Sequence, residues 1–147
     1  MIFIRIRIKT RGWPFFSRSG KKIFIEGALL GEQVAVDFTF VHSRFLEARV
    51  VEILSASSHR VEPRCPHFSM CGGCLLQHMT GDAQIHYKEN MLREQLTHIG
   101  GGEPKEGYLP PVVGPLYGYR RRARLSVKFV QKKQKVLVGF REKHSPF

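Results

Sequence analysis

Three cysteines that lie within ten residues of one another are the side chains of this sequence best suited to chemistry. Cys65, Cys71 and Cys74 follow the pattern Cys-x5-Cys-x2-Cys, and both residues between the last two are glycine. Thiolates two residues apart can chelate one metal centre, and two glycines free the backbone to make the tight turn. Such thiolate sets suit iron–sulfur clusters, whereas zinc takes Cys3His sets about as readily. The spacing therefore predicts a metal site, with an iron–sulfur cluster as the preferred occupant.

Other roles for the cysteine loop stay open at this point. Zinc with His67 or His78 as a fourth ligand is the main alternative. The cysteines could also be small buried apolar residues, or one could be a catalytic thiol, although no base and orienting group can be recognised nearby. His67, His78 and His86 are each, taken singly, ordinary polar residues. An odd number of cysteines in one short loop argues against a disulfide framework and predicts a reducing, cytoplasmic setting.

The residues before this loop have the pattern of short strands. Apolar residues alternate with other residues over 2–9 and 34–40, and residues 45–54 are rich in β-branched and apolar types. Residues 22–26 form a further short segment after a Ser-Gly turn signal. Glycines separate several of these segments, as in tight turns. Four such strands predict a small OB-like β-barrel over residues 1–55.

The residues from 56 to 147 predict a second, α+β domain that contains the cysteine loop. Apolar residues at helical spacing predict one helix over 82–99, whose apolar stripe we expect to be core. Residues 103–118 contain four prolines and predict an extended connection. Alternation over 123–129, a polar turn at 131–134 and a return over 136–140 predict a β-hairpin with one core face and one basic face. The fold class is therefore mainly β with some α.

The net charge of +12 is unevenly distributed. Residues 1–22 hold seven Lys or Arg and no acidic residue, and residues 119–143 hold ten basic residues and one acidic residue. Two basic blocks around an acidic middle predict contact with a polyanion, most simply nucleic acid. No apolar stretch is long enough for a membrane span, and the first residues do not form a secretory signal.

At the cysteine loop the sequence resembles a known family. The strings Arg-Val-Glu-Pro-Arg-Cys-Pro-His-Phe (60–68), Cys-Gly-Gly-Cys (71–74) and Leu-Gln-His (76–78) resemble the cysteine motif of bacterial 23S ribosomal RNA uracil-5-methyltransferases. Residues 24–32 are similar to the family's TRAM segment, and residues 119–125 and 138–141 to the hairpin of its central domain. The resemblance runs from about residue 21 to 143, and the cysteine motif is its specific part.

The resemblance implies a TRAM β-barrel, an iron–sulfur central domain and, in the full-length enzyme, a Rossmann-like domain that binds S-adenosylmethionine. The family holds a 4Fe–4S cluster with four cysteines, of which Cys65, Cys71 and Cys74 match three. This sequence has no fourth cysteine, no cofactor loop and no cysteine that could attack uracil carbon 6. We therefore expect a portion that is incomplete at its C-terminus, has no catalytic or cofactor-binding residue and is inactive alone.

The function expected from this resemblance is that of an rRNA-binding and cluster-binding N-terminal portion, cytoplasmic and monomeric, without DNA or membrane partners. The residues expected to contact phosphates are Lys21, Lys22, Arg120, Arg121, Arg122, Arg124 and Lys128. A stand-alone RNA-binding module with structural zinc is one alternative, and an electron-transfer protein is another. Residues 13–16, Trp-Pro-Phe-Phe, depart from the TRAM pattern, because Pro14 disfavours a central strand. They could stack on bases, but we favour a core filler or a decayed segment.

Overall fold

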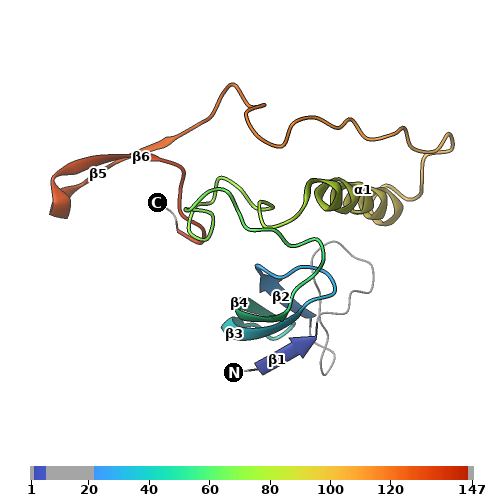
Figure 1. Cartoon of the computed structure of the whole chain (residues 1–147), viewed down its shortest axis with the longest axis horizontal. Coiled ribbons are helices and arrows are strands. Elements are labelled where there is room, and N and C mark those ends of the chain that lie inside the picture. Colours follow the sequence, from blue (N-terminus) through green and yellow to red (C-terminus); the bar gives the residue numbers. More distant parts are fainter. Residues whose placement is uncertain (1, 6–21, 146–147) are drawn as a thin grey trace. The chain divides into compact units, whose positions relative to one another are not determined.

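The computed structural model describes residues 2–5 and 22–145, and the chain separates into two compact units (Figure 1). The first unit comprises Met1–Arg60 with Asp82–Pro111, and the second comprises Val61–Gly81 with Val112–Phe147. The described residues are mainly β with one long helix, which agrees with the predicted class. The domain boundary at residues 55–56 stays a prediction. The Trp-Pro-Phe-Phe segment and Lys21 lie outside the described residues.

The first unit contains a four-stranded sheet in the order β1-β3-β4-β2. Its strands are β1 Ile2–Arg5, β2 Lys22–Glu26, β3 Gln33–Val41 and β4 Phe45–Ser55. The β2–β4 pair is parallel, and the β1–β3 and β3–β4 pairs are antiparallel. One face forms a small aliphatic core, made by Ile23, Ile25, Ala28, Val34, Val36 and Ala48. As described, this sheet is open, so the closed barrel stays a prediction.

A buried carboxylate ties the turn between β2 and β3 to the chain that leaves β4. Glu32 has no solvent-exposed surface, and Arg60 donates from Nε to its Oε1 at 2.5 Å and from Nη2 to its Oε2 at 2.8 Å. The backbone N–H groups of Leu29 and Ser57 donate to the same carboxylate at 2.7 and 3.2 Å. Arg60 also donates to the carbonyl oxygen of Gly27 at 2.6 Å. Four donors thus satisfy a charge that would otherwise be costly to bury.

The helix α1 spans Gly81–His98 and ends near glycine, as the sequence predicts. The prediction that its apolar stripe is core is wrong for this structure, because no residue of the helix is buried and Ile99 is 85% exposed. The chain after α1 supplies little cover, since residues 103–118 run as a largely exposed connection. Tyr108 lies against Arg93 of α1, with 4.0 Å from the guanidinium carbon to the ring centroid. In residues 2–5 and 22–145, no helix is both long and apolar enough to cross a membrane.

The second unit contains the predicted β-hairpin. Strand β5 spans Ser126–Val130, a 3-10 turn η1 spans Gln131–Lys133, and strand β6 spans Lys135–Gly139. Strand β5 begins three residues later than predicted, because β6 ends at Gly139, which pairs with Ser126 and leaves residues 123–125 without a partner strand. The expected core face is not buried either: Val127 is 69% exposed. The hairpin is confirmed, and its burial is not.

Candidate metal centre and RNA interface

Backbone hydrogen bonds wind the cysteine loop into consecutive turns. The N–H of Phe68 donates to the carbonyl of Cys65 at 3.0 Å, and the N–H of Cys71 donates to that of His67 at 2.7 Å. The side-chain oxygen of Gln77 accepts from the N–H of Cys65 at 3.2 Å. The loop is therefore shaped largely by its own backbone, as expected for a segment with few apolar residues to bury.

The segment that follows β6 forms backbone hydrogen bonds with the cysteine loop. The N–H of Gly72 donates to the carbonyl of Arg141 at 2.9 Å, and the N–H of Lys143 donates to that of Met70 at 2.7 Å. Cys71 and Glu142 form an antiparallel bridge between these two bonds. A Cβ added at Gly72 would lie 3.0 Å from the Arg141 carbonyl oxygen. Glycine at position 72 therefore permits close contact between two backbones, a role that the sequence pattern alone did not reveal.

The three cysteines are free thiols in this arrangement. Cys65 and Cys71 are half-buried and Cys74 is exposed, and the N–H of Gly73 donates to the sulfur of Cys71 at 3.4 Å. That bond would stabilise a thiolate, so the donor chemistry fits a soft metal centre. The described residues nevertheless include no group of three His, Cys, Asp or Glu placed to hold a metal ion. The local turn fits metal ligation, whereas the convergence of three sulfurs stays a prediction.

The two histidines considered as zinc ligands have different surroundings. His67 is exposed and contributes its carbonyl to the loop's turns, whereas His78 is buried with its ring 5.4 Å from that of Phe68. Lys143 lies over the same Phe68 ring at 4.5 Å from its centroid. His78 therefore packs against Phe68 within the loop, whereas the side chain of His67 is accessible to solvent.

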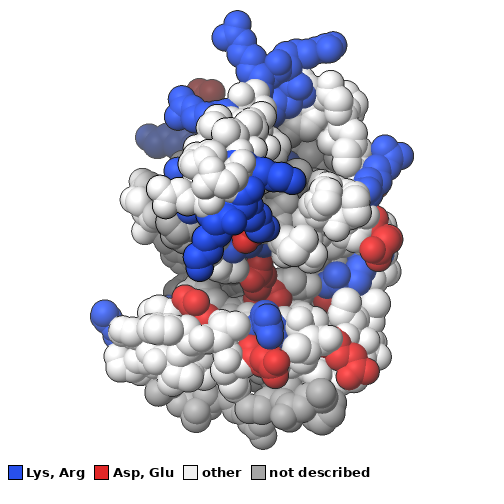
Figure 2. Space-filling view, turned by 90° about the vertical axis from the view of Figure 1, so that its left-hand side faces the viewer, with Lys and Arg blue, Asp and Glu red and all other residues white. Residues whose placement is uncertain are grey.

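The predicted phosphate-binding residues of the second unit are all exposed: Arg120, Arg121, Arg122, Arg124 and Lys128. They lie in the irregular segment that leads into the hairpin and on β5, and Lys132, Lys133 and Lys135 surround the hairpin turn. Figure 2 shows Lys and Arg side chains gathered in groups on one face, with few Asp or Glu among them. In the first unit Lys22 is exposed at the start of β2. All of the predicted phosphate-binding residues that the structure describes are therefore accessible to a polyanion.

Arg124 and Arg141 line a wide hollow of about 450 Å³ in the second unit. The hydroxyl of Ser126 lies 3.2 Å from Nε of Arg141, which donates to it, and Gly72 and Glu142 also line the hollow. Arg141 was not among the predicted contacts. Its position as a basic residue directly after a basic hairpin was the available signal, but its contact with the cysteine loop depends on the fold.

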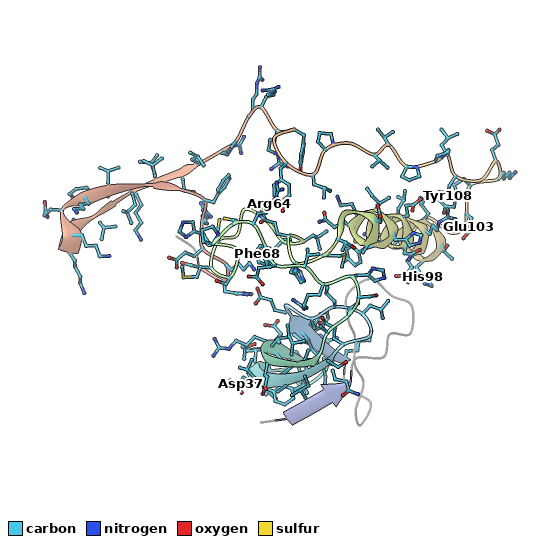
Figure 3. The ribbon with its side chains drawn as sticks, in the orientation of Figure 1. Asp37, Arg64, Phe68, His98, Glu103 and Tyr108 are labelled. Carbon is cyan, nitrogen blue, oxygen red and sulfur yellow. The ribbon has the colours of Figure 1, made fainter. Side chains whose placement is uncertain are left out.

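One further ring contact flanks the loop. The guanidinium carbon of Arg64 lies 4.7 Å from the centroid of the Tyr117 ring. In Figure 3 the labelled Phe68 lies within the cysteine loop, where the contacts with His78 and Lys143 fix it. The two cation–π contacts, from Arg64 and Lys143, are worth roughly 0.5–1 kcal/mol each at exposed sites, so they support the loop's conformation without defining a ligand.

Comparison with curated proteins gives closely similar relatives. The chain is 51% identical over 130 residues to the 23S rRNA (uracil(1939)-C(5))-methyltransferase RlmD of Alcanivorax borkumensis, covering 88% of this chain and 29% of that protein. It is 54% identical over 128 residues to the protein of the same name from Nitrosococcus oceani, covering 86% and 28%. The corresponding protein of Francisella tularensis subsp. novicida is 50% identical over 129 residues, covering 87% and 29%. No family model matches the chain.

These similarities relate the chain to proteins that are named as rRNA methyltransferases. More narrowly, it belongs to the 23S rRNA uracil-5-methyltransferase family and corresponds to the N-terminal part of its members. It spans less than a third of the length of the relatives it matches. The family resemblance drawn from the cysteine motif is thereby confirmed.

Proposed function

We propose that this chain is the rRNA-binding N-terminal portion of a 23S rRNA uracil-5-methyltransferase. The observation that carries the proposal is the exposed basic stretch from Arg120 to Lys135, in a chain about half identical to proteins named for this reaction. Lys and Arg side chains bind phosphates independently of base sequence, and they give binding that weakens as salt rises. The activity itself belongs to the whole enzyme, which needs S-adenosylmethionine.

The basic residues would bind RNA phosphates in two different places. Arg120, Arg121 and Arg122 lie in an extended segment, so their guanidinium groups can reach successive phosphates in bidentate fashion. Arg124 and Arg141 line the open hollow, where a phosphate could be held beside the Ser126 hydroxyl. An OB-like TRAM barrel in the first unit would supply an RNA-binding surface of its own, with Lys22 at its edge. Cytoplasmic location and a monomeric state belong to the same proposal.

Cys65, Cys71 and Cys74 are the residues that would hold a 4Fe–4S cluster. The thiolate donor set and the N–H of Gly73 directed at the sulfur of Cys71 support metal ligation, and the resemblance of the cysteine motif favours a cluster over zinc. When bound, the cluster would cross-link the loop, while the backbone ladder between the loop and residues 141–143 transmits that order to the hairpin. A structural role fits better than electron transfer, because the surrounding surface is strongly basic.

We expect Cys71→Ser and Cys74→Ser to lose most bound iron after anaerobic purification, because serine does not supply a thiolate. Iron and sulfide analysis with a visible spectrum measures this, and Ser69→Ala in the same loop is the matched control. Colourless wild-type protein with one zinc per chain would instead favour the zinc module and refute the cluster.

The RNA proposal is tested by fluorescence anisotropy with the intact chain and a labelled 23S rRNA fragment that contains the target uridine. We expect saturable binding that is tighter than binding to a DNA duplex of the same length at the same salt. Equal affinity for RNA and DNA would reduce the chain to a general polyanion binder, and absence of binding to RNA would refute the proposal.

A further inference from the structure

Four rings form a continuous cluster on the first unit's sheet, at the end where β3 turns into β4. The rings of His42 and Phe45 stack with centroids 4.8 Å apart and planes 18° apart. The rings of Phe40 and His42 follow at 6.3 Å and 25°. Phe24 meets Phe45 edge-on at 5.5 Å and 84°. We call Phe24, Phe40, His42 and Phe45 the aromatic cluster.

Strand alternation and one irregularity place these rings on the face opposite the core. Ile23 and Ala48 point into the core. Phe24 is the next residue after Ile23, and Phe45 is three residues before Ala48, so both side chains point to the opposite face of the sheet. The β3–β4 register shifts between Phe38 and Phe40, which brings Phe40 opposite Glu47 on the outward face. The N–H of His42 donates to the carbonyl of Phe45 at 2.9 Å, which keeps these two rings together.

The end of the cluster is held in place but not covered. Phe40 is 52% exposed, and His42 and Phe45 are half-buried. The N–H of Arg44 donates to Nδ1 of His42 at 3.4 Å, and the Ser43 hydroxyl lies 3.3 Å from the same nitrogen. If the cluster served only to pack the turn between β3 and β4, burial of Phe40 would stabilise that turn most. About half of Phe40 nevertheless faces solvent.

We propose that the aromatic cluster is a base-stacking site for single-stranded RNA. The near-parallel Phe45, His42 and Phe40 rings leave an exposed π face at the Phe40 end, and any base can extend such a stack. Two basic residues near the cluster could bind the phosphates on either side of a stacked base. Arg44 precedes Phe45 in the sequence, and Lys22 is opposite Phe45 in the β2–β4 register. Glu47 is the acidic residue beside Phe40 in the register, and it disfavours a purely electrostatic contact there.

This inference rests on the proposed function for the identity of the polymer, but it assigns a different contact. The basic residues of the second unit would hold phosphates, whereas the aromatic cluster would hold bases. Phosphate contacts depend on salt, and stacking does not depend on the charge of the strand. The two kinds of contact can therefore be separated with one pair of ligands.

The test compares two labelled oligomers of about twelve nucleotides, one of uridine and one abasic with the same number of phosphates. We expect the intact chain to bind the uridine oligomer about tenfold more tightly than the abasic one. The double variant Phe40→Ala/His42→Ala should bind both oligomers with the affinity that the wild type shows for the abasic oligomer. Phe40→Trp should retain the preference, and Val41→Ala, at the same turn, should not change it.

The outcomes separate the two proposals. A wild type that binds both oligomers equally, or a double variant that keeps the full preference, overturns base stacking and leaves phosphate binding intact. A double variant that loses affinity for both oligomers in equal proportion while keeping its unfolding midpoint also overturns it. Failure of the wild type to bind either oligomer overturns the RNA function together with this inference.

Discussion

Replacing Arg60 with methionine lowers the free energy of unfolding of the first unit by about 3–5 kcal/mol. The size follows from burial: Glu32 is 0% exposed and the Arg60 side chain is 18% exposed, so the substitution leaves a buried carboxylate without its cation. Two backbone N–H groups, from Leu29 and Ser57, would remain as donors. Methionine preserves much of the packing of the arginine stem, so the loss reports the charge.

Urea unfolding of the intact chain, followed by far-ultraviolet circular dichroism and by hydrogen exchange at Val34 and Val36, measures this loss. Arg49→Met is the matched control, because Arg49 is an exposed arginine of β4 that stands opposite Asp37 in the register. A loss below about 1 kcal/mol for Arg60→Met would show that the pair behaves as an ordinary surface ion pair.

The same pair makes the first unit sensitive to acid. Burial raises the pKa of Glu32, but the hydrogen bonds from Arg60, Leu29 and Ser57 and the Arg60 charge together lower that pKa below its usual value. Stability from a lowered pKa is present above the unfolded value of about 4.3 and is lost as pH falls through the folded pKa. We expect the wild type to lose stability below about pH 4, and Glu32→Gln to lose this part of the pH dependence. Identical acid-unfolding curves for the two proteins would contradict the assignment.

Replacing Arg120, Arg121 and Arg122 together with glutamine weakens RNA binding by at least about tenfold at ~0.1 M salt. Each phosphate contact contributes roughly 0.7–0.9 to the salt slope, so the slope should become shallower by about 2–3. The three residues are exposed in an irregular segment, so the substitution should leave the unfolding midpoint unchanged. Anisotropy titrations at several salt concentrations give both quantities.

A second triple variant controls for net charge. Lys88, Arg93 and Lys105 are exposed cations on α1 and in the connection after it. Changing them to glutamine removes the same charge from a different place. If both triple variants lose affinity equally, the basic segment has no special role and binding reflects the total charge of the chain.

Local patterns predicted those elements that local interactions build. Alternation and a polar turn were sufficient for the β5–β6 hairpin, where Gln134 adopts a left-handed conformation that closes the turn. Glycine after α1 marked the end of the helix. The burial of α1 and of the hairpin was predicted wrongly, because an apolar stripe shows which face can be buried and not whether a partner covers it.

Contacts between residues distant in sequence could not be predicted in this way. Glu32 and Arg60 are 28 residues apart, and the sequence around neither residue indicates that the two form an ion pair. The backbone hydrogen bonds between the cysteine loop and residues 141–143 also depend on the direction that the chain takes after β6. The outward position of Phe40 depends on a register shift that strict alternation does not foresee. The second and third of these features belong to the candidate sites, and the first belongs to the fold.

The salt dependence of RNA affinity for the intact chain tests the central proposal most directly. The measurement is a plot of the logarithm of the binding constant for a 23S rRNA fragment against the logarithm of salt concentration. Phosphate binding by the four exposed arginines 120, 121, 122 and 124 with Lys128 predicts a straight line with a slope of about −3.5 to −4.5. A slope near zero, or no measurable binding at ~0.05 M salt, would contradict the assignment of this chain as an rRNA-binding portion.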